Sequence, residues 1–493
     1  MPDTVTLDIN GARVQVAAGV TVAAALDLRR GARAVVRYGH LLRVSRDHRR
    51  ASARAQLPGT GARRNGGADH MSGPLKIVVV GAGPAGIAAA VRASGAGAAV
   101  TVIDDNPAPG GQIWRHGNRR HGGDAQRWFS KLRNSSATML AGNRVIAPGS
   151  EPGRLLVEMP DGARELPFDR LILATGAREI FLPFPGWTLP GVTGAGGLQA
   201  LVQGGLPIAG KRVVVAGSGP LLLAVAAFCR SRGAQVCLVA EQASTQALFA
   251  FALRLTRAPG NLLQALRLRA ALAGVGYRTS SWVEAAEGDG RLESVRVRTS
   301  NTTVTLPCDY AAVAYGLFPN TELAALLGCQ VTSEGVVTGA LQETSRPSVY
   351  SSGECAGIGG VELSLVEGEI AGLAAAGDAR RAQTLLRMRE RARRFASHFR
   401  QTFALRPELM QLAAADTIFC RCEDVRFAGL ADYTTFRAAK LHTRCGMGTC
   451  QGRVCGTAGQ FLFGWTNDSV RPPVFPASVE ALAAPDSLVK EVS

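Results

Sequence analysis

The stretch Lys76–Ala90 reads KIVVVGAGPAGIAAA, an apolar strand that leads through a glycine turn into a helix of small residues. Gly81 permits the tight turn, and Gly83 lets backbone N–H groups approach a pyrophosphate. Gly86 lets the helix pack close to the sheet, with the helix N-terminus facing the phosphates. The stretch therefore predicts a loop that holds the diphosphate of a dinucleotide.

The next strand supplies the acid that such a unit needs. Residues 99–103, AVTVI, end in Asp104–Asp105, and Asp104 is placed to accept hydrogen bonds from a ribose. The order strand, glycine turn, helix, strand and acid favours a Rossmann-like unit over a purely structural glycine turn. The cofactor contacts expected of this unit are Gly81, Gly83, Pro84, Ala85, Gly86, Asp104 and Asp105.

A second copy of the unit begins at residues 211–227, KRVVVAGSGPLLLAVAA, and its second strand ends at Glu241. Leu222 stands where the third glycine should be, and its side chain would push the helix away or crowd the cofactor cleft. Glu241 suits a ribose hydroxyl and repels a 2′-phosphate, which argues against NADP. Occupation by NAD, by ATP or by nothing stays open, with Gly217, Gly219 and Glu241 as the expected contacts.

Three short motifs lie where a flavoprotein with two such units returns to its first domain. Residues 171–176 read LILATG, so that Thr175 and Gly176 bring backbone close to a dinucleotide. Residues 311–320 read AAVAYGLFPN, and residues 348–360 read SVYSSGECAGIGG. In the last motif Gly353–Glu354 is expected to meet the ribityl and phosphate region of the flavin. Together these motifs predict an α/β fold with two Rossmann-like domains and bound FAD.

The cysteines gather near the C-terminus. None of the ten occurs before Cys229, and five fall in the segment that runs from FCRCEDV at 419–425 to TRCGMGTCQGRVCG at 443–456. Several thiolates suit zinc or an iron–sulfur cluster. The Cys-x-Cys spacing is unusual for zinc, and a flavin that passes on single electrons needs a one-electron acceptor. A [2Fe–2S] cluster is therefore favoured, with zinc or a ligand-free structural cluster as the alternatives.

The net charge of +17 is not read as a nucleic-acid surface, because Lys contributes only five of the 55 basic residues. Such an excess of Arg is typical of a GC-rich codon bias, and no reader motif or aromatic interleaving accompanies it. The sequence has no apolar run long enough to span a membrane and no secretory signal pattern. We expect a cytoplasmic protein, or one that is peripheral at the inner membrane through its electron acceptor.

The motif order resembles the pyridine-nucleotide-disulfide oxidoreductase class over about residues 74–400. The redox cysteine pair of its disulfide-reducing members has no counterpart before residue 445, which excludes thiol–disulfide exchange by this domain. Within the class, residues 110–115 (GGQIWR), 217–223 (GSGPLLL) and 471–473 (RPP) resemble the A subunits of opine oxidases, hydrogen cyanide synthase and D-hydroxyproline or proline dehydrogenases. The first of these motifs adds Gly111 and Gln112 to the expected cofactor contacts.

The cysteine segment resembles the small ferredoxin domain of bacterioferritin-associated ferredoxin, in the longer version attached to flavoproteins. That resemblance implies Cys420, Cys422, Cys450 and Cys455 as the ligands of a [2Fe–2S] cluster. Cys445 would lie beside the cluster without ligating it. Arg444 and Arg453 would help to offset the negative charge of the cluster.

The resemblance also implies the work of the chain and its partners. A separate subunit similar to D-amino-acid oxidases would oxidise an amino or imino acid, and a small ferredoxin-like subunit is a further option. The present chain would receive the electrons, with FMN at the subunit interface as an option, and pass them through the cluster to a quinone or another acceptor. No catalytic residue is assigned to this chain. The alternatives are a self-sufficient NAD(P)H-dependent reductase and a non-catalytic assembly or redox-sensing subunit.

The N-terminal region resembles the start of a β-grasp ferredoxin-like module that lacks its cysteines, so we interpret it as a degenerate remnant. A start of translation at Met71 is the alternative, and in both cases residues 1–70 are expected to be dispensable. The expected segments are the remnant with its linker (1–72), the FAD-binding domain (73–205), the second nucleotide-binding domain (206–305), the return to the FAD-binding domain (306–402), the [2Fe–2S] domain (403–475) and a tail (476–493).

Overall fold

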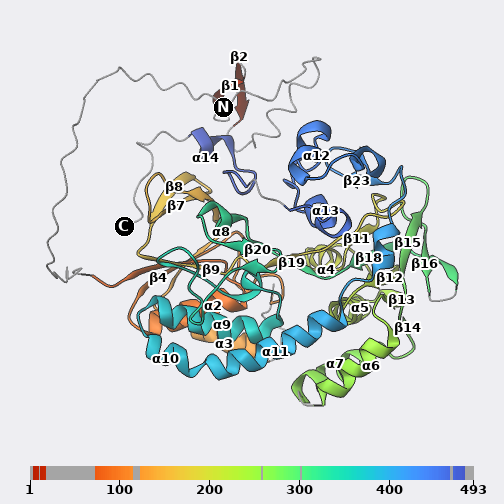
Figure 1. Ribbon diagram of the computed structural model, residues 1–493, viewed down its shortest axis with the longest axis horizontal. Coiled ribbons are helices and arrows are strands. Elements are labelled where there is room, and N and C mark those ends of the chain that lie inside the picture. The colour runs from red at the N-terminus through yellow and green to blue at the C-terminus, as the bar shows by residue number, and fades with distance from the viewer. Residues whose placement is uncertain are drawn as a thin grey trace.

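The apolar strand at Lys76–Val80 (β3) lies at the centre of the first parallel sheet in the computed structural model (Figure 1). The structure describes residues 4–9, 12–17, 73–114, 123–256, 259–299, 302–466 and 470–483. The strand order of this sheet is β22-β9-β3-β4-β5, and every pair is parallel. The other four strands are β22 (Val349–Ser351), β9 (Arg170–Leu173), β4 (Ala99–Asp104) and β5 (Thr138–Ala141). The strand of the first glycine motif (β3) and the strand of the motif at 348–360 (β22) therefore belong to the same sheet.

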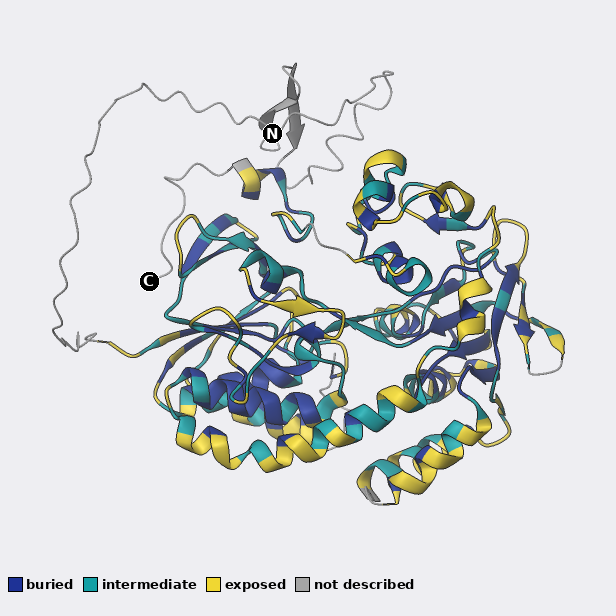
Figure 2. Cartoon of the chain, in the orientation of Figure 1, coloured by how far each residue is buried: buried dark blue, intermediate teal, exposed yellow. Residues whose placement is uncertain are grey.

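Helices cover this sheet. Helix α2 (Pro84–Gly95) packs against α9 (Gly360–Ala375), and α3 (Gly123–Arg133) lies beside α2. Helix α9 is buried along most of its length, because α10 (Ala379–Thr384) and α11 (Leu386–Thr402) cover its outer side (Figure 2). An antiparallel sheet of β6 (Arg144–Pro148), β7 (Arg154–Met159) and β8 (Gly162–Pro167) completes this domain.

The second parallel sheet has the order β11-β18-β12-β13-β14. Its strands are β11 (Val192–Gly194), β18 (Tyr310–Ala314), β12 (Arg212–Gly217), β13 (Gln235–Glu241) and β14 (Gly276–Arg278). The expected boundaries at 205/206 and 305/306 differ from this arrangement, since β11, α4 (Ala195–Gln203) and β18 all belong to the second domain. Strand β18 pairs with β12 in the middle of the sheet, which sequence distance does not reveal.

Leu222 does not crowd a cleft. It lies on α5 (Leu221–Ser231) and is fully buried in the core between this helix and the sheet, among Val213, Val215 and Ala312. The expectation that it crowds the cofactor cleft is therefore wrong, while the alternative, that it pushes the helix away from the sheet, stays a prediction. The remaining helices of the domain are α6 (Thr245–Leu255) and α7 (Pro259–Ala271), and an antiparallel sheet is formed by β15 (Trp282–Glu287), β16 (Ser294–Arg298) and β17 (Thr303–Pro307).

Two short strands join the domains: β10 (Ala177–Glu179) pairs antiparallel with β19 (Leu317–Pro319). Beyond them lie the helix α8 (Glu322–Leu326) and the strand pair β20 (Val331–Thr332) and β21 (Gly335–Val336), and the short helix η1 (Gly353–Ala356) follows β22. The crossing strands place the motifs at 171–176 and 311–320 side by side.

The cysteine-rich segment forms a small unit over the second domain (Figure 1). The short helix η2 (Pro407–Gln411) leads into this unit, which contains β23 (Ile418–Cys420), β24 (Val425–Arg426), η3 (Phe427–Leu430), α12 (Phe436–Thr443) and α13 (Cys455–Phe463). The indole N–H of Trp187 donates to the carbonyl of Ile418 at 2.5 Å, so the unit is tied to the second domain. Part of the expected tail, including α14 (Val479–Ala483), instead packs on β6 and β8 of the first domain.

Near the N-terminus, β1 (Thr4–Ile9) and β2 (Ala12–Ala17) form an antiparallel pair. The rest of the expected remnant, residues 1–3, 10–11 and 18–72, lies outside the described residues. Among the helices that the structure describes, none combines the length and the apolar character needed to cross a bilayer.

Candidate functional site

The first glycine turn has the geometry of a phosphate-binding loop. Gly81 takes a φ of +103°, and a Cβ at this position would overlap the carbonyl of Ala174. A Cβ at Gly86 would overlap the carbonyl of Gly81, so the helix starts directly against the turn. Gly81 and Gly83 are half-buried at the surface of the sheet edge, where the backbone remains accessible to a ligand.

The two acids after β4 differ in their surroundings. Asp104 is buried and accepts the backbone N–H of Ala82 at 2.5 Å, so it stabilises the glycine turn from below. Asp105 is exposed, and its carboxylate lies 3.9 Å from Nε of Arg144. The inner acid thus shapes the turn while the outer acid faces solvent.

The remaining motifs of the first unit meet at this turn. Gly110 donates its backbone N–H to the carbonyl of Ala82 at 2.7 Å, which sets the neighbouring Gly111 against Gly83, and Gln112 next to it is exposed. The structure therefore brings the described part of this loop, residues 110–114, to the phosphate-binding turn.

Thr175, in the motif at 171–176, and Asn320, in the motif at 311–320, each donate a side-chain hydrogen bond to the backbone carbonyl of the other. The hydroxyl of Thr175 donates to the carbonyl of Asn320 at 2.7 Å, and the side-chain amide of Asn320 donates to the carbonyl of Thr175 at 2.9 Å. The backbone N–H of Asn320 also donates to the carbonyl of Gly176 at 3.0 Å. Asn320 belongs to a motif that sequence reasoning identified, but its pairing partner is visible only in the fold.

A buried charge pair supports the Gly353–Glu354 motif. Gly353 packs against Ala85 of α2, and its N–H donates to Glu367 Oε2 at 3.2 Å. Arg393 of α11 donates to Glu367 Oε1 at 2.9 Å. Burial raises the pKa of Glu367, and the charge and hydrogen bonds of Arg393 oppose that rise. Burial likewise raises the pKa of Glu354, against a hydrogen bond from the N–H of Gly360.

The residues present fit FAD in the first unit. A cradle without side chains at Gly81, Gly83 and Gly111 leaves room for a diphosphate, and the helix N-terminus offers backbone N–H groups. The sequence did not single out Glu367 and Arg393, because nothing in their local pattern distinguishes them from surface charges of a helix. Their role follows only from the packing of α9 and α11 behind the turn.

The second glycine turn has the same framework in a different setting. Glu241 accepts the N–H of Gly219 at 2.8 Å, as Asp104 does for Ala82, and it also accepts the N–H of Ala243 at 2.9 Å. Burial raises the pKa of Glu241 to about 7. In contrast to the first turn, Gly217 and Gly219 are buried.

Three buried cysteines form the most compact group of ligand atoms in the described residues. The Sγ atoms of Cys420, Cys445 and Cys455 all lie within 4.8 Å of one another. Hydrogen bonds with Cys445 and Cys455 lower the pKa of the Cys420 thiol, and the N–H of Gly446 donates to its sulfur at 3.4 Å. A set of converging thiols with a backbone donor suits a thiolate-ligated metal or cluster.

The other two cysteines lie at the rim of this group. Cys422 is exposed and lies beside the half-buried Cys450. Partial desolvation raises the pKa of the Cys422 thiol, and the charge and side chain of Cys450 raise it further. The structure thus places Cys445, which the resemblance sets outside the ligand set, with Cys420 and Cys455. The assignment of Cys420, Cys422, Cys450 and Cys455 as ligands stays a prediction.

Two arginines border the cysteine loop. Arg444 pairs with Glu423 at 2.6 Å, and Arg453 donates to the carbonyl of Val474 at 2.6 Å and to that of Cys450 at 3.4 Å. The guanidinium of Arg453 also lies over the ring of Phe475, 4.3 Å from its centroid. Arg453 therefore ties the cysteine loop to the C-terminal segment that packs on the first domain.

Known proteins are similar to this chain in sequence and in fold. Residues 75–392 match the pyridine nucleotide-disulphide oxidoreductase family. The chain is 31% identical over 424 residues to hydrogen cyanide synthase subunit HcnB of Pseudomonas aeruginosa, covering 77% of this chain and 91% of that protein. It is 33% identical over 463 residues to the A subunit of opine oxidase from Rhizobium meliloti, covering 82% and 98%. The crystal structure of L-proline dehydrogenase from P. horikoshii has the same fold, with a TM-score of 0.58, 18% identity and 98% coverage of both chains.

Proposed function

This chain belongs to the pyridine nucleotide-disulphide oxidoreductase family as a flavin-dependent oxidoreductase, and from that premise we propose that it is the electron-transfer subunit of a heteromeric amino- or imino-acid dehydrogenase. The observation that supports this most is the cysteine group fused to a flavoprotein fold. When bound, FAD takes up electrons in pairs and can release them singly, and a [2Fe–2S] cluster accepts one at a time.

In this proposal the chain's own residues hold the two groups and keep them in place. The turn from Gly81 to Gly86 binds the diphosphate of FAD, Asp104 and Asp105 lie at its ribose, and Asp104 also fixes the turn through the N–H of Ala82. Gly353 and Glu354 meet the phosphate and ribityl region. Cys420, Cys422, Cys450 and Cys455 hold the [2Fe–2S] cluster, and Arg453 fixes the loop that carries Cys450.

The substrate is read by a partner subunit in this proposal. HcnB and the A subunit of opine oxidase are each named as one subunit of a larger enzyme, which supports a partner for this chain. The partner resembles D-amino-acid oxidases, FMN at the interface is an option, and a quinone or another acceptor takes the electrons. A self-sufficient NAD(P)H-dependent reductase is the second candidate, and the preserved turn at Gly217–Gly219 is the observation in its favour.

Two measurements on the purified full-length chain test the proposal. Visible spectra with flavin, iron and labile-sulfide analysis are expected to give FAD together with iron and sulfide, and bound zinc or no flavin would refute it. Under anaerobic conditions the flavin is expected to bleach only when an amino or imino acid is supplied together with the partner subunit. Rapid bleaching by NADH alone would instead establish the second candidate.

A matched variant separates flavin reduction from onward transfer. Cys450→Ser is expected to keep flavin bleaching by the partner while the reduction of an external acceptor is lost. Cys237→Ser, an exposed cysteine of β13 far from the cysteine segment in sequence, serves as the control. Full acceptor reduction by the Cys450→Ser enzyme would contradict a route through the cluster.

A further inference from the structure

The end of α11 covers the second glycine turn. A Cβ at Gly219 would lie 3.7 Å from Cζ of Phe399 and 3.9 Å from Cγ of Phe403, so both rings rest on the turn. The two rings also contact each other, with centroids 4.8 Å apart, and Phe403 packs against Phe251 of α6 at 5.5 Å. Aromatic side chains therefore occupy the side of the turn from which a diphosphate would approach.

The polar side chains beside this turn, Ser218 and Gln242, form hydrogen bonds with main-chain atoms of the segment Phe403–Leu412. We call this segment the linker. The hydroxyl of Ser218 donates to the carbonyl of Phe403 at 3.1 Å. The amide nitrogen of Gln242 donates to the carbonyl of Ala404 at 3.1 Å and to Ser218 Oγ at 2.9 Å, and its oxygen accepts the N–H of Arg406 at 3.2 Å. Ser218 and Gln242 are both buried, so these contacts replace water.

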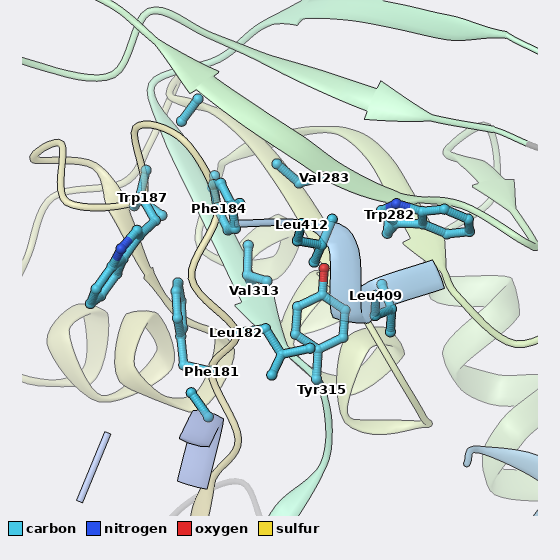
Figure 3. Close-up of a cluster of buried hydrophobic side chains, with 14 of the residues drawn as sticks. Phe181, Leu182, Phe184, Trp187, Trp282, Val283, Val313, Tyr315, Leu409 and Leu412 are labelled. Carbon is cyan, nitrogen blue, oxygen red and sulfur yellow. The ribbon is translucent and has the colours of Figure 1, made fainter. Parts of the chain in front are cut away.

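Apolar contacts continue the attachment toward the cysteine unit. Leu409 and Leu412 lie in the hydrophobic core of the second domain together with Trp282 and Tyr315, as Figure 3 shows. Leu409 is fully buried. Arg406 lies over the ring of Trp282, 5.5 Å from its centroid. The linker is thus held by hydrogen bonds to Ser218 and Gln242 at the turn, and by apolar packing of Leu409 and Leu412 further along the chain.

The first unit differs at each of these points. Its turn is half-exposed, and the exposed Asp105 follows the buried Asp104. In the second unit the fully buried Gln242 follows Glu241 and faces the linker. The same strand-turn-helix framework therefore presents an open edge in one domain and a filled edge in the other.

We propose that the nucleotide-binding edge of the second domain is the docking site of the chain's own linker, and that it holds the cysteine unit in place of a dinucleotide. Ser218 at the turn and Gln242 after the second strand bind the carbonyls of residues 403–404, where a nucleotide-binding domain would bind the phosphates and the ribose of its ligand. The consequence is a fixed position of the cysteine unit relative to the second domain. This inference goes beyond the proposed function, because it holds for any substrate and any electron acceptor.

Binding and proteolysis of the full-length protein test this docking. Calorimetric titration with NADH, NAD⁺ and ATP at millimolar concentration is expected to give no binding that depends on the second cleft. Gln242→Glu places a carboxylate against the carbonyls of Phe403 and Ala404, so the linker should open more often. Tryptic cleavage after Arg400 or Arg406 should then be about tenfold faster, the fold-change expected when buried carbonyls lose their donor.

Gln246→Glu, an exposed position on α6, is the matched control and should cleave at the wild-type rate. If Gln242→Glu does not retain flavin, Phe403→Ala is read in the same way, because it removes the ring that covers Gly219. NADH, NAD⁺ or ATP binding that is abolished by Gly219→Val would overturn the inference. Equal rates of tryptic cleavage for Gln242→Glu and for the control Gln246→Glu would also overturn it.

Discussion

The charge pair behind the FAD turn gives the sharpest test of how this structure is stabilised. Arg393→Met keeps the aliphatic stem of the side chain and removes its guanidinium. The side chain of Glu367 is 2% exposed, and Arg393 donates to its Oε1 through Nη2 at 2.9 Å and Nε at 3.1 Å. After the change, Glu367 would keep the N–H of Gly353 as a donor but would lose its paired cation.

The expected cost follows from the asymmetry of this pair. Removing one partner of a buried ion pair costs about 3–5 kcal/mol, because the other charge is left uncompensated. The side chain of Arg393 is 35% exposed, so water already screens its end of the pair. We therefore expect a loss of about 3 kcal/mol at pH 8, the lower end of that range.

The sign of the pH dependence is fixed by the pKa of Glu367. Burial raises this pKa above its ordinary value, and removal of Arg393 should raise it further. An acid whose folded-state pKa is raised favours folding when protonated, so its contribution is lost as pH rises from the ordinary glutamate pKa through the folded-state value. The deficit of Arg393→Met should therefore be smaller at pH 5.5 than at pH 8.

Chemical denaturation followed by circular dichroism and by flavin release measures both effects. Adding Glu367→Gln to the Arg393→Met chain should restore most of the stability at pH 8, because the buried carboxylate that lost its partner is then removed. Arg394→Met, at an exposed position on the same helix, is the control. A loss below about 1 kcal/mol at pH 8, the range of a surface pair, would refute the reasoning, and so would equal losses at the two pH values.

Three further predictions concern the sites. Cys450→Ser should remove iron and labile sulfide while Cys445→Ser keeps them; the reverse result would move Cys445, which lies with Cys420 and Cys455, into the ligand set. Gly86→Ala should abolish flavin absorbance because its Cβ would overlap the Gly81 carbonyl, whereas Gly95→Ala, with no atom within 4 Å of its Cβ, should retain it. The pKa of Glu241 is about 7, so stability should fall by up to about 3 kcal/mol as pH rises from 4.5 to 8, and Glu241→Gln should flatten this profile; an unchanged slope would count against the buried carboxyl.

Local sequence signals predicted those parts of the protein that depend on a few neighbouring residues. The turn at Gly81–Gly86 has one conformation that its glycines permit, and the φ of Gly81 and the close start of α2 agree with it. The order of the motifs also predicted two parallel sheets, because each strand-turn-helix unit builds its own sheet locally. The resemblance to HcnB and to the A subunits of opine oxidases is confirmed by the comparisons.

Signals of this kind do not reach across the fold. The expected domain boundaries differ from the sheets because β18 returns to pair with β12 about 100 residues after it. Leu222 was expected to push the helix away or to crowd the cleft, and it lies in the core, since the rotation of α5 on its sheet is set by packing. The convergence of Cys445 with Cys420 and Cys455 likewise depends on how β23 and α13 pack.

By itself the sequence determined an α/β flavoprotein fold with a thiol-rich C-terminal unit, because glycine turns, strand periodicity and cysteine spacing are local properties. Only the tertiary structure decided what each site faces. Two turns with the same first two glycines differ because α11 and the linker pack over Gly219, whereas the equivalent Gly83 stays half-exposed. That difference arises from contacts between residues about 160–185 positions apart, such as Gln242 with Ala404 and Ser218 with Phe403, which no local pattern encodes.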